Sequence, residues 1–212
     1  MRGFGPLGIA SILVILFGNV LFVPLSAILA LAWAWRSRTP WSEIGYAPQN
    51  WFTSAAIGIA FGGLLKLLLK AAVMPLFHAP PVNPAYRSLA ANPQAIPEML
   101  YLLVVGAGFG EETVFRGYMF ERIGKWMGRT IPAKVATVAI TTIWFGAGHY
   151  STQGVPGVQQ ALITGAIFGT IFAMTGRLWM LMCAHAAFDL TAYALIYWNL
   201  ENSVAHWIFK AQ

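Results

Sequence analysis

The sequence contains few charged residues. Only 9% of its 212 residues are Asp, Glu, Lys or Arg, and 58% are hydrophobic. A soluble domain carries about a quarter charged residues, so this composition excludes an ordinary water-soluble protein. It predicts an all-α fold, a polytopic membrane helical bundle of about six transmembrane helices around a buried polar site. We expect residues 1–212 to form a single integral membrane domain, with the lipid bilayer as its surroundings.

Acidic residues and cysteine are also scarce. Seven acidic residues stand against thirteen lysines and arginines, and the basic residues are spread through the connecting segments. That distribution indicates membrane topology rather than a nucleic-acid partner. Cys183 is the only cysteine, which excludes an internal disulfide and a cysteine-rich zinc cluster. It lies in an apolar segment, where a small buried hydrophobic residue is the expected role.

Long hydrophobic runs divide the chain into expected membrane spans. Their approximate ranges are 8–35, 52–77, 97–121, 133–149, 159–174 and 178–198. Five prolines, at positions 80, 81, 84, 93 and 97, prevent a regular helix between the second and third spans. This predicts a proline-rich extramembrane loop over residues 78–97. Residues 96–198 are expected to form the core that carries the polar motifs.

Basic residues orient the expected bundle. Segments 36–50, 121–134 and 175–177 hold seven lysines and arginines, and the opposite side holds three, namely Arg2, Arg87 and Lys210. The positive-inside rule then places the basic loops in the cytoplasm and both termini outside. The expected location is the plasma membrane of a bacterium or archaeon.

Two glutamates and an arginine interrupt the third hydrophobic segment. Glu112 and Arg116 are four residues apart, so they share a helix face and can neutralise one another. Glu111 lies about 100° further round the helix, where Arg116 does not reach it. Charged groups at that depth are costly and normally mark a site. We interpret Glu112 and Arg116 as a structural clamp, with Glu111 left for chemistry.

Three more polar side chains lie in later hydrophobic segments. His149 follows Phe145 by four residues, and His185 precedes Asp189 by four, so each pair shares a helix face. At about 1.5 Å per residue from the nearest cytoplasmic charge, Glu111 and His185 lie roughly 12–17 Å deep and His149 roughly 22 Å. Tilted helices are needed to bring them together. The spacing predicts one polar site, open to water from the cytoplasmic side.

The pattern of these residues resembles the CAAX-processing and bacteriocin-processing family of intramembrane proteases. The three elements are Glu111-Glu112-x-x-x-Arg116, Phe145-x-x-x-His149 and His185-x-x-x-Asp189. They occur in the family's order over 79 residues, 111 to 189, on successive hydrophobic segments. That family includes the prenyl-protein endoprotease of eukaryotes and bacterial Abi and lysostaphin-resistance-type proteins.

The resemblance implies an intramembrane endopeptidase and assigns a role to each residue. Glu111 would activate a water that His149 helps to hold, and His185 with Asp189 would stabilise the oxyanion. Glu112 and Arg116 would brace the site. An ionised Asp cannot donate a hydrogen bond, so Asp189 would be protonated or would orient His185. The implied substrate is a peptide or membrane-anchored protein, with a lipidated tail among the candidates.

The same residues permit a zinc site made of Glu111, His149 and His185, with Asp189 as a further ligand or supporting group. We favour the mechanism without a cofactor, because the sequence lacks an HExxH motif and a zinc-bound Glu111 would leave no separate base.

Three other classes of protein fit some of these residues. A proton- or ion-coupled transporter also keeps ionisable residues in the membrane, but the sequence lacks the internal repeat or paired broken helices typical of transporters. A haem protein with His149 and His185 as axial ligands leaves Glu111 unexplained. A catalytically idle membrane scaffold is the third, and the complete set of polar residues favours a protease over it.

Overall fold

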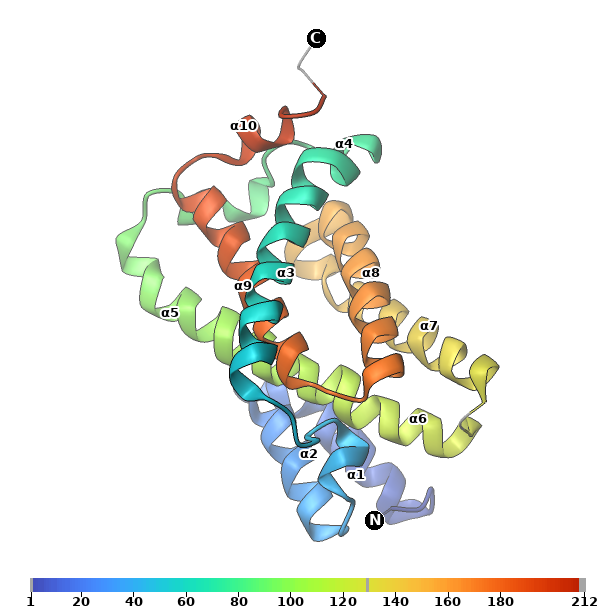
Figure 1. Cartoon of the computed structure of the whole chain (residues 1–212). Coiled ribbons are helices and arrows are strands. Elements are labelled where there is room, and N and C mark those ends of the chain that lie inside the picture. The colour runs from blue at the N-terminus through green and yellow to red at the C-terminus, as the bar shows by residue number, and fades with distance from the viewer. Residues whose placement is uncertain (1, 129, 210–212) are drawn as a thin grey trace.

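The computed structural model describes residues 2–128 and 130–209, and every regular element within these ranges is helical. Four long helices are apolar enough to cross a membrane, and they cover Trp51–Leu76, Ile131–Gly148, Tyr150–Thr175 and Trp179–Tyr197. They stand side by side as a bundle (Figure 1). The predicted all-helical, polytopic membrane fold is therefore confirmed.

Small residues allow the long helices to approach closely. Helix α3 (Trp51–Leu68) continues through a π-helical turn, η3 (Leu69–Val73), into α4 (Met74–Leu76) and packs against α9 (Trp179–Tyr197). A Cβ placed on Gly62 would lie 2.0 Å from the carbonyl oxygen of Ala184, so only glycine permits this contact. Helices α7 (Ile131–Gly148) and α8 (Tyr150–Thr175) form the second closely packed pair.

The glutamate motif lies on a long helix that crosses the bundle obliquely (Figure 1). It begins as α5 (Ile96–Tyr101), continues as the π-helical segment η6 (Leu102–Tyr118) and ends as α6 (Met119–Met127). π-Helical segments are rare and occur mostly at functional sites. Gly108 of η6 allows a close approach to α9, because a Cβ there would lie 2.9 Å from the carbonyl oxygen of Met182.

The expected first span, 8–35, is wrong: this stretch forms two helices that fold back on one another. Helix α1 (Pro6–Phe17) leads through the turn η1 (Gly18–Val20) to α2 (Leu25–Arg36). Asn19 and Ser26 close the turn reciprocally, since each backbone N–H donates to the other's side-chain oxygen, at 3.0 and 2.9 Å. The tip of this hairpin contacts the motif helix, where the Tyr101 hydroxyl donates to the Val23 carbonyl at 2.6 Å.

The hairpin brings residue 2 to the end of the bundle that carries the basic segments. The Arg2 guanidinium pairs with Glu43 and lies 3.6 Å from Glu121, and its carbonyl accepts from Arg122 at 2.8 Å. We call this end, formed by residues 36–50, 121–128, 130–134 and 175–178, the basic end. The C-terminal helix α10 (Glu201–Ala205) lies at the opposite end (Figure 1). Residue 2 and α10 thus lie at opposite ends of the bundle, whereas the sequence predicted both termini on one side of the membrane.

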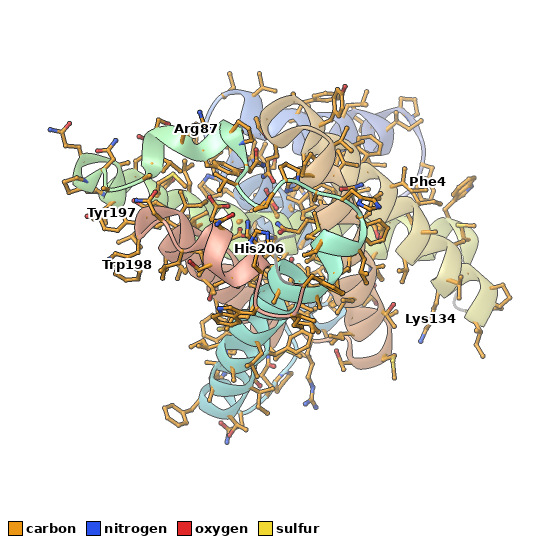
Figure 2. All side chains as sticks on the ribbon, turned by 90° about the horizontal axis from the view of Figure 1, so that it is seen from above. Phe4, Arg87, Lys134, Tyr197, Trp198 and His206 are labelled. Carbon is orange, nitrogen blue, oxygen red and sulfur yellow. The ribbon has the colours of Figure 1, made fainter. Side chains whose placement is uncertain are left out.

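The proline-rich segment 78–97 forms only short turns over the other end of the bundle, which we call the loop end. Its main turn, η4 (Pro84–Leu89), is capped by Asn83, whose side-chain oxygen accepts from the Ala85 N–H. The Asn83 amide also donates to the Gln153 carbonyl at 3.3 Å, which ties the loop to α8. Figure 2 looks onto this end, with Arg87 and His206 labelled on it. Arg129 and Lys210, counted in the charge comparison, lie outside the described residues.

Candidate active site

A fully buried ion pair forms the base of the site. The Arg116 guanidinium donates to Glu112 Oε1 at 2.8 Å, as their spacing predicts, and the two side chains are 2% and 0% exposed. The guanidinium carbon also lies 4.7 Å from the ring centre of Phe145 and 5.7 Å from that of Phe168. Aromatic faces attract cations, so these two rings help to hold the arginine in place.

Glu112 has a second partner that the sequence did not reveal. His185 Nδ1 donates to the same Glu112 Oε1 at 2.7 Å, because a buried carboxylate paired with arginine can only accept. This bond fixes the imidazole of His185. Its Nε2 is thereby directed towards Glu111 and Asp189, at 3.8 Å and 3.6 Å from their carboxylate oxygens. Both distances are too long for a hydrogen bond.

Glu111 lies next to Glu112 in the chain but in a different environment. Its side chain is 32% exposed, whereas that of Glu112 is completely buried. Glu111 Oε2 has no hydrogen-bond partner among the described residues. A carboxylate with an unused acceptor, facing a cavity, can take a proton from a bound molecule.

His149 is held by the last turn of its own helix. Its Nδ1 lies 2.8 Å from the carbonyl oxygen of Phe145, and since a carbonyl only accepts, Nδ1 carries the proton. Nε2 of the neutral imidazole is therefore an acceptor. The His149 ring centre lies 4.5 Å from that of Phe145, which also packs against Arg116 and so joins the two parts of the site.

All four candidate catalytic residues line one cavity of about 260 Å³, which we call the central cavity. Three helices supply them: the motif helix carries Glu111, α7 is followed by His149, and α9 carries His185 and Asp189. The oblique course of the motif helix removes the mismatch in depth expected from the sequence. Residues that we had not predicted complete the wall, among them Asn19, Val23, Gln153, Gln160 and Thr164.

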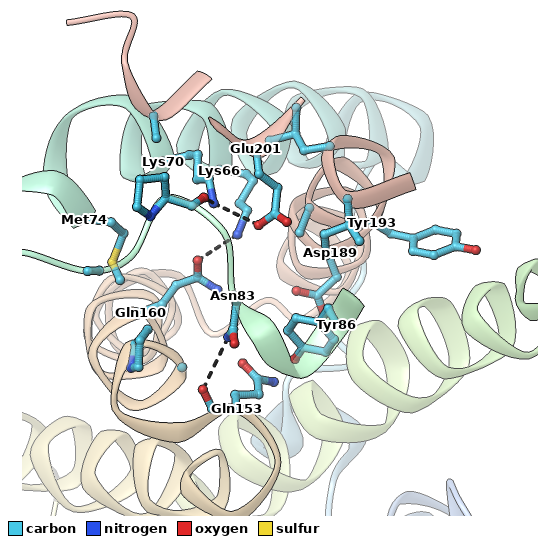
Figure 3. Close-up of a pocket in the computed structure, with 18 of the residues that line it drawn as sticks. Lys66, Lys70, Met74, Asn83, Tyr86, Gln153, Gln160, Asp189, Tyr193 and Glu201 are labelled. Atoms are coloured by element: carbon cyan, nitrogen blue, oxygen red, sulfur yellow. Dashed lines mark hydrogen bonds and ion pairs between the residues drawn. The ribbon is translucent and has the colours of Figure 1, made fainter. Parts of the chain in front are cut away.

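A second cavity adjoins the central cavity towards the loop end (Figure 3). It measures about 150 Å³, and we call it the lysine cavity after Lys66 and Lys70. The two cavities share five lining residues: Met99, Leu103, Gln153, Gln160 and Asp189. Loop residues Pro80, Pro81, Asn83 and Tyr86 and helix α10 form its outer wall. A third cavity, at the basic end, shares no lining residue with the central cavity.

The cavities connect the site to one end of the bundle. The lysine cavity shares five lining residues with the central cavity and is bounded by the loop, whereas the cavity at the basic end shares none. The expectation that the site is open to water from the cytoplasmic side stays a prediction.

Tyr86 of the loop lies beside Asp189 in the lysine cavity (Figure 3). Burial raises the pKa of its phenol, and the negative charges of Asp189 and Glu111 raise it further. The phenol therefore stays protonated and can donate a hydrogen bond into the cavity. No signal in the sequence distinguished this tyrosine from an ordinary loop residue.

The geometry gives no support to a zinc site. Within the described residues, no group of three or more His, Cys, Asp or Glu side chains is placed to hold a metal. Of the three proposed ligands, His185 has its Nδ1 bonded to Glu112 and His149 has its Nδ1 bonded to a carbonyl, which leaves one nitrogen on each. The preference for a mechanism without metal stays a prediction.

Comparison with known proteins identifies the segment that carries these residues. Residues 93–191 match the family model described as type II CAAX prenyl endopeptidase Rce1-like. No curated protein and no solved structure gave a match. The matched range contains all three motifs, so the resemblance seen in the sequence is confirmed. Residues 93–191 are therefore similar to the Rce1-like family of type II CAAX prenyl endopeptidases.

Proposed function

We propose that the protein hydrolyses a peptide bond in a membrane-associated, lipid-modified substrate, with Glu111 as the base that activates water. One observation carries this proposal: Glu111 lines the central cavity with a side chain that is 32% exposed and makes no ion pair with Arg116, while the adjacent Glu112 is completely buried and accepts from Arg116 and His185 through Oε1. The family match of residues 93–191 supports the reaction class. The assignment of each residue rests on the contacts described above.

The first step is attack by water on the substrate carbonyl. Glu111 takes one proton from the water, and His149 Nε2 accepts a hydrogen bond from the other O–H, which orients the oxygen for attack. The new C–O bond converts the carbonyl oxygen into an oxyanion. His185, held through Nδ1 by Glu112, presents Nε2 to the cavity and in its imidazolium form donates to that oxyanion.

Asp189 has one remaining role in this scheme. Glu112, rather than Asp189, holds His185, since the distance from His185 Nε2 to Asp189 is 3.6 Å. A protonated Asp189 carboxyl would supply a second donor to the oxyanion. In the last step, the oxyanion reforms the carbonyl as the C–N bond breaks, Glu111 gives its proton to the leaving amine, and the second water proton stays on the new carboxyl group.

The route into the site favours a substrate that enters from the loop end. If the positive-inside rule holds for the basic end, the loop end lies on the non-cytoplasmic face of the membrane. Apolar helix surfaces beside the cavity would accommodate a lipid chain, and the peptide would reach Glu111 through the lysine cavity.

The alternative is a zinc-dependent version of the same protease. Measuring turnover after metal chelation tests it, and we expect turnover to be retained.

The experiment compares membrane peptides from cells carrying the wild type with those from cells carrying Glu111→Ala. We expect an uncleaved precursor to accumulate with the variant, while the abundance of the two proteins is similar, because Glu111 is not part of the buried ion pair. Mass spectrometry of the membrane fraction measures both. Identical processing in the two strains would argue against hydrolysis by Glu111.

A further inference from the structure

Lys66 is a buried cation outside the catalytic group. It lies on α3 and is 8% exposed. Its ammonium donates to Gln160 Oε1 at 2.7 Å and lies 5.0 Å from the ring centre of Phe188. Within the described residues, no carboxylate forms an ion pair with it. Asp189 and Glu201 line the same cavity without pairing with Lys66, so a bound anion that came within hydrogen-bond distance would give this buried charge a direct counter-ion.

The neighbouring lysine has a different environment. Lys70 lies one turn further along the same helix and pairs with Glu201 of α10 at 2.9 Å. It also donates to the Pro81 carbonyl at 2.6 Å, so it joins α3, α10 and the loop. The Glu201 carboxylate and the Pro81 carbonyl oxygen therefore already pair with the Lys70 ammonium within the protein. Of the two lysines in the cavity, only Lys66 can take a new anionic partner.

The position of Lys66 relates it to the catalytic residues. Its hydrogen-bond partner Gln160 lines both the lysine cavity and the central cavity, as does Asp189 (Figure 3). The lining of the lysine cavity is mixed, and its apolar part includes Met74, Leu103, Leu195 and Ile196. A short apolar peptide segment leaving the central cavity would therefore run beside apolar walls and end near an ammonium group.

We propose that Lys66 binds the C-terminal carboxylate of the substrate. This inference rests on the proposed function, because it assigns the segment between the cleaved bond and the chain end to the lysine cavity. The two cavities share five lining residues, so a peptide held at Glu111 can extend from the central cavity into the lysine cavity. The Gln160 side-chain N–H₂ supplies a second donor beside Lys66.

The test uses the full-length protein carrying Glu111→Gln, purified in detergent, so that peptides bind without being cleaved. Two farnesylated peptides of identical sequence end in a carboxylate or in an amide. We expect the carboxylate peptide to bind at least about tenfold more tightly, as a charge-assisted hydrogen bond predicts. Adding Lys66→Met should remove this preference, and adding Lys66→Arg should keep part of it.

Lys70→Met is the matched control, because it removes the same charge from the same helix and cavity. It should weaken both peptides alike, since Lys70 already has Glu201 as its partner. Equal binding of the two peptides with Lys66 in place would overturn the proposal, and this comparison does not require any lysine variant to fold. A preference that persists in Lys66→Met, or disappears in Lys70→Met, would overturn it too.

The two proposals can fail separately. If wild-type protein cleaves both peptides with the same KM and kcat, the carboxylate site is wrong and the protease stands. If the carboxylate peptide binds through Lys66 but the wild type cleaves neither peptide, the binding site stands and the proteolytic function is wrong.

Discussion

Two adjacent glutamates with the same chemistry occupy opposite environments in this protein. Glu112 accepts from Arg116 and His185 and is sealed from the cavity, while Glu111 is one-third exposed and lacks a hydrogen-bond partner among the described residues. The difference follows from the rotation between neighbouring positions of a helix. Sequence spacing alone was enough to predict the contact between Glu112 and Arg116. The contact with His185 was not predictable, since it depends on where α9 packs.

Glu112→Gln is expected to reduce stability as well as turnover. The substitution leaves Arg116 buried without a counter-ion and weakens the anchor of His185, at a cost of about 3–5 kcal/mol in the free energy of unfolding. Unfolding titrations in mixed detergent measure this loss. Glu111→Gln, which breaks no buried pair, serves as the comparison and should unfold like the wild type. Equal stability of Glu112→Gln and the wild type would contradict the structural role of the pair.

At the level of elements, hydropathy alone did not predict how the first 36 residues fold. An apolar run of span length can be one crossing helix or a hairpin of two short helices, and both have the same composition. The hairpin forms here because Asn19 and Ser26 close the turn with reciprocal hydrogen bonds. In the sequence alone, Asn19 and Pro24 are equally typical of one kinked helix. The partner of the hairpin tip, the motif helix near Gly106, was not visible in the sequence.

The hairpin can be tested by cross-linking. In a Cys183→Ser background, cysteines replacing Val23 and Gly106 should react with a short bifunctional thiol reagent, because a Cβ on Gly106 would lie 3.0 Å from the Val23 side chain. Val20→Cys with Gly106→Cys is the control, since Val20 is 80% exposed. The protein is then cleaved with a protease between the two cysteine positions and run on a denaturing gel, where cross-linked fragments migrate together. Absence of a Val23–Gly106 product would favour a single crossing helix.

At the scale of the whole molecule, the hairpin changes the charge balance. Arg2 lies at the basic end, where the sequence predicted it on the opposite side; of the described residues in that comparison, seven lysines and arginines then stand at the basic end and Arg87 at the loop end. The bundle architecture was predictable from composition, and the family match of residues 93–191 was predictable from the order of the motifs. The position of the lysine cavity was not predictable, because it depends on how residues 78–97 fold over the bundle.

Labelling of single cysteines tests the orientation. With Cys183→Ser as background, Ser88→Cys at the loop end should react with a membrane-impermeant maleimide in intact cells. Lys125→Cys at the basic end should react only after the cells are permeabilised. Both positions are exposed in the structure. The reverse pattern would place the loop end, and with it the entrance to the site, in the cytoplasm.

The most direct test of the central claim is turnover of a farnesylated peptide by purified protein reconstituted in lipid. We predict that Glu111→Gln lowers kcat by at least about a hundredfold, as loss of a general base does, without loss of folding. Glu98→Gln, the same change at an exposed position earlier on the motif helix, should retain wild-type turnover. Cleavage by Glu111→Gln at the wild-type rate would contradict the account.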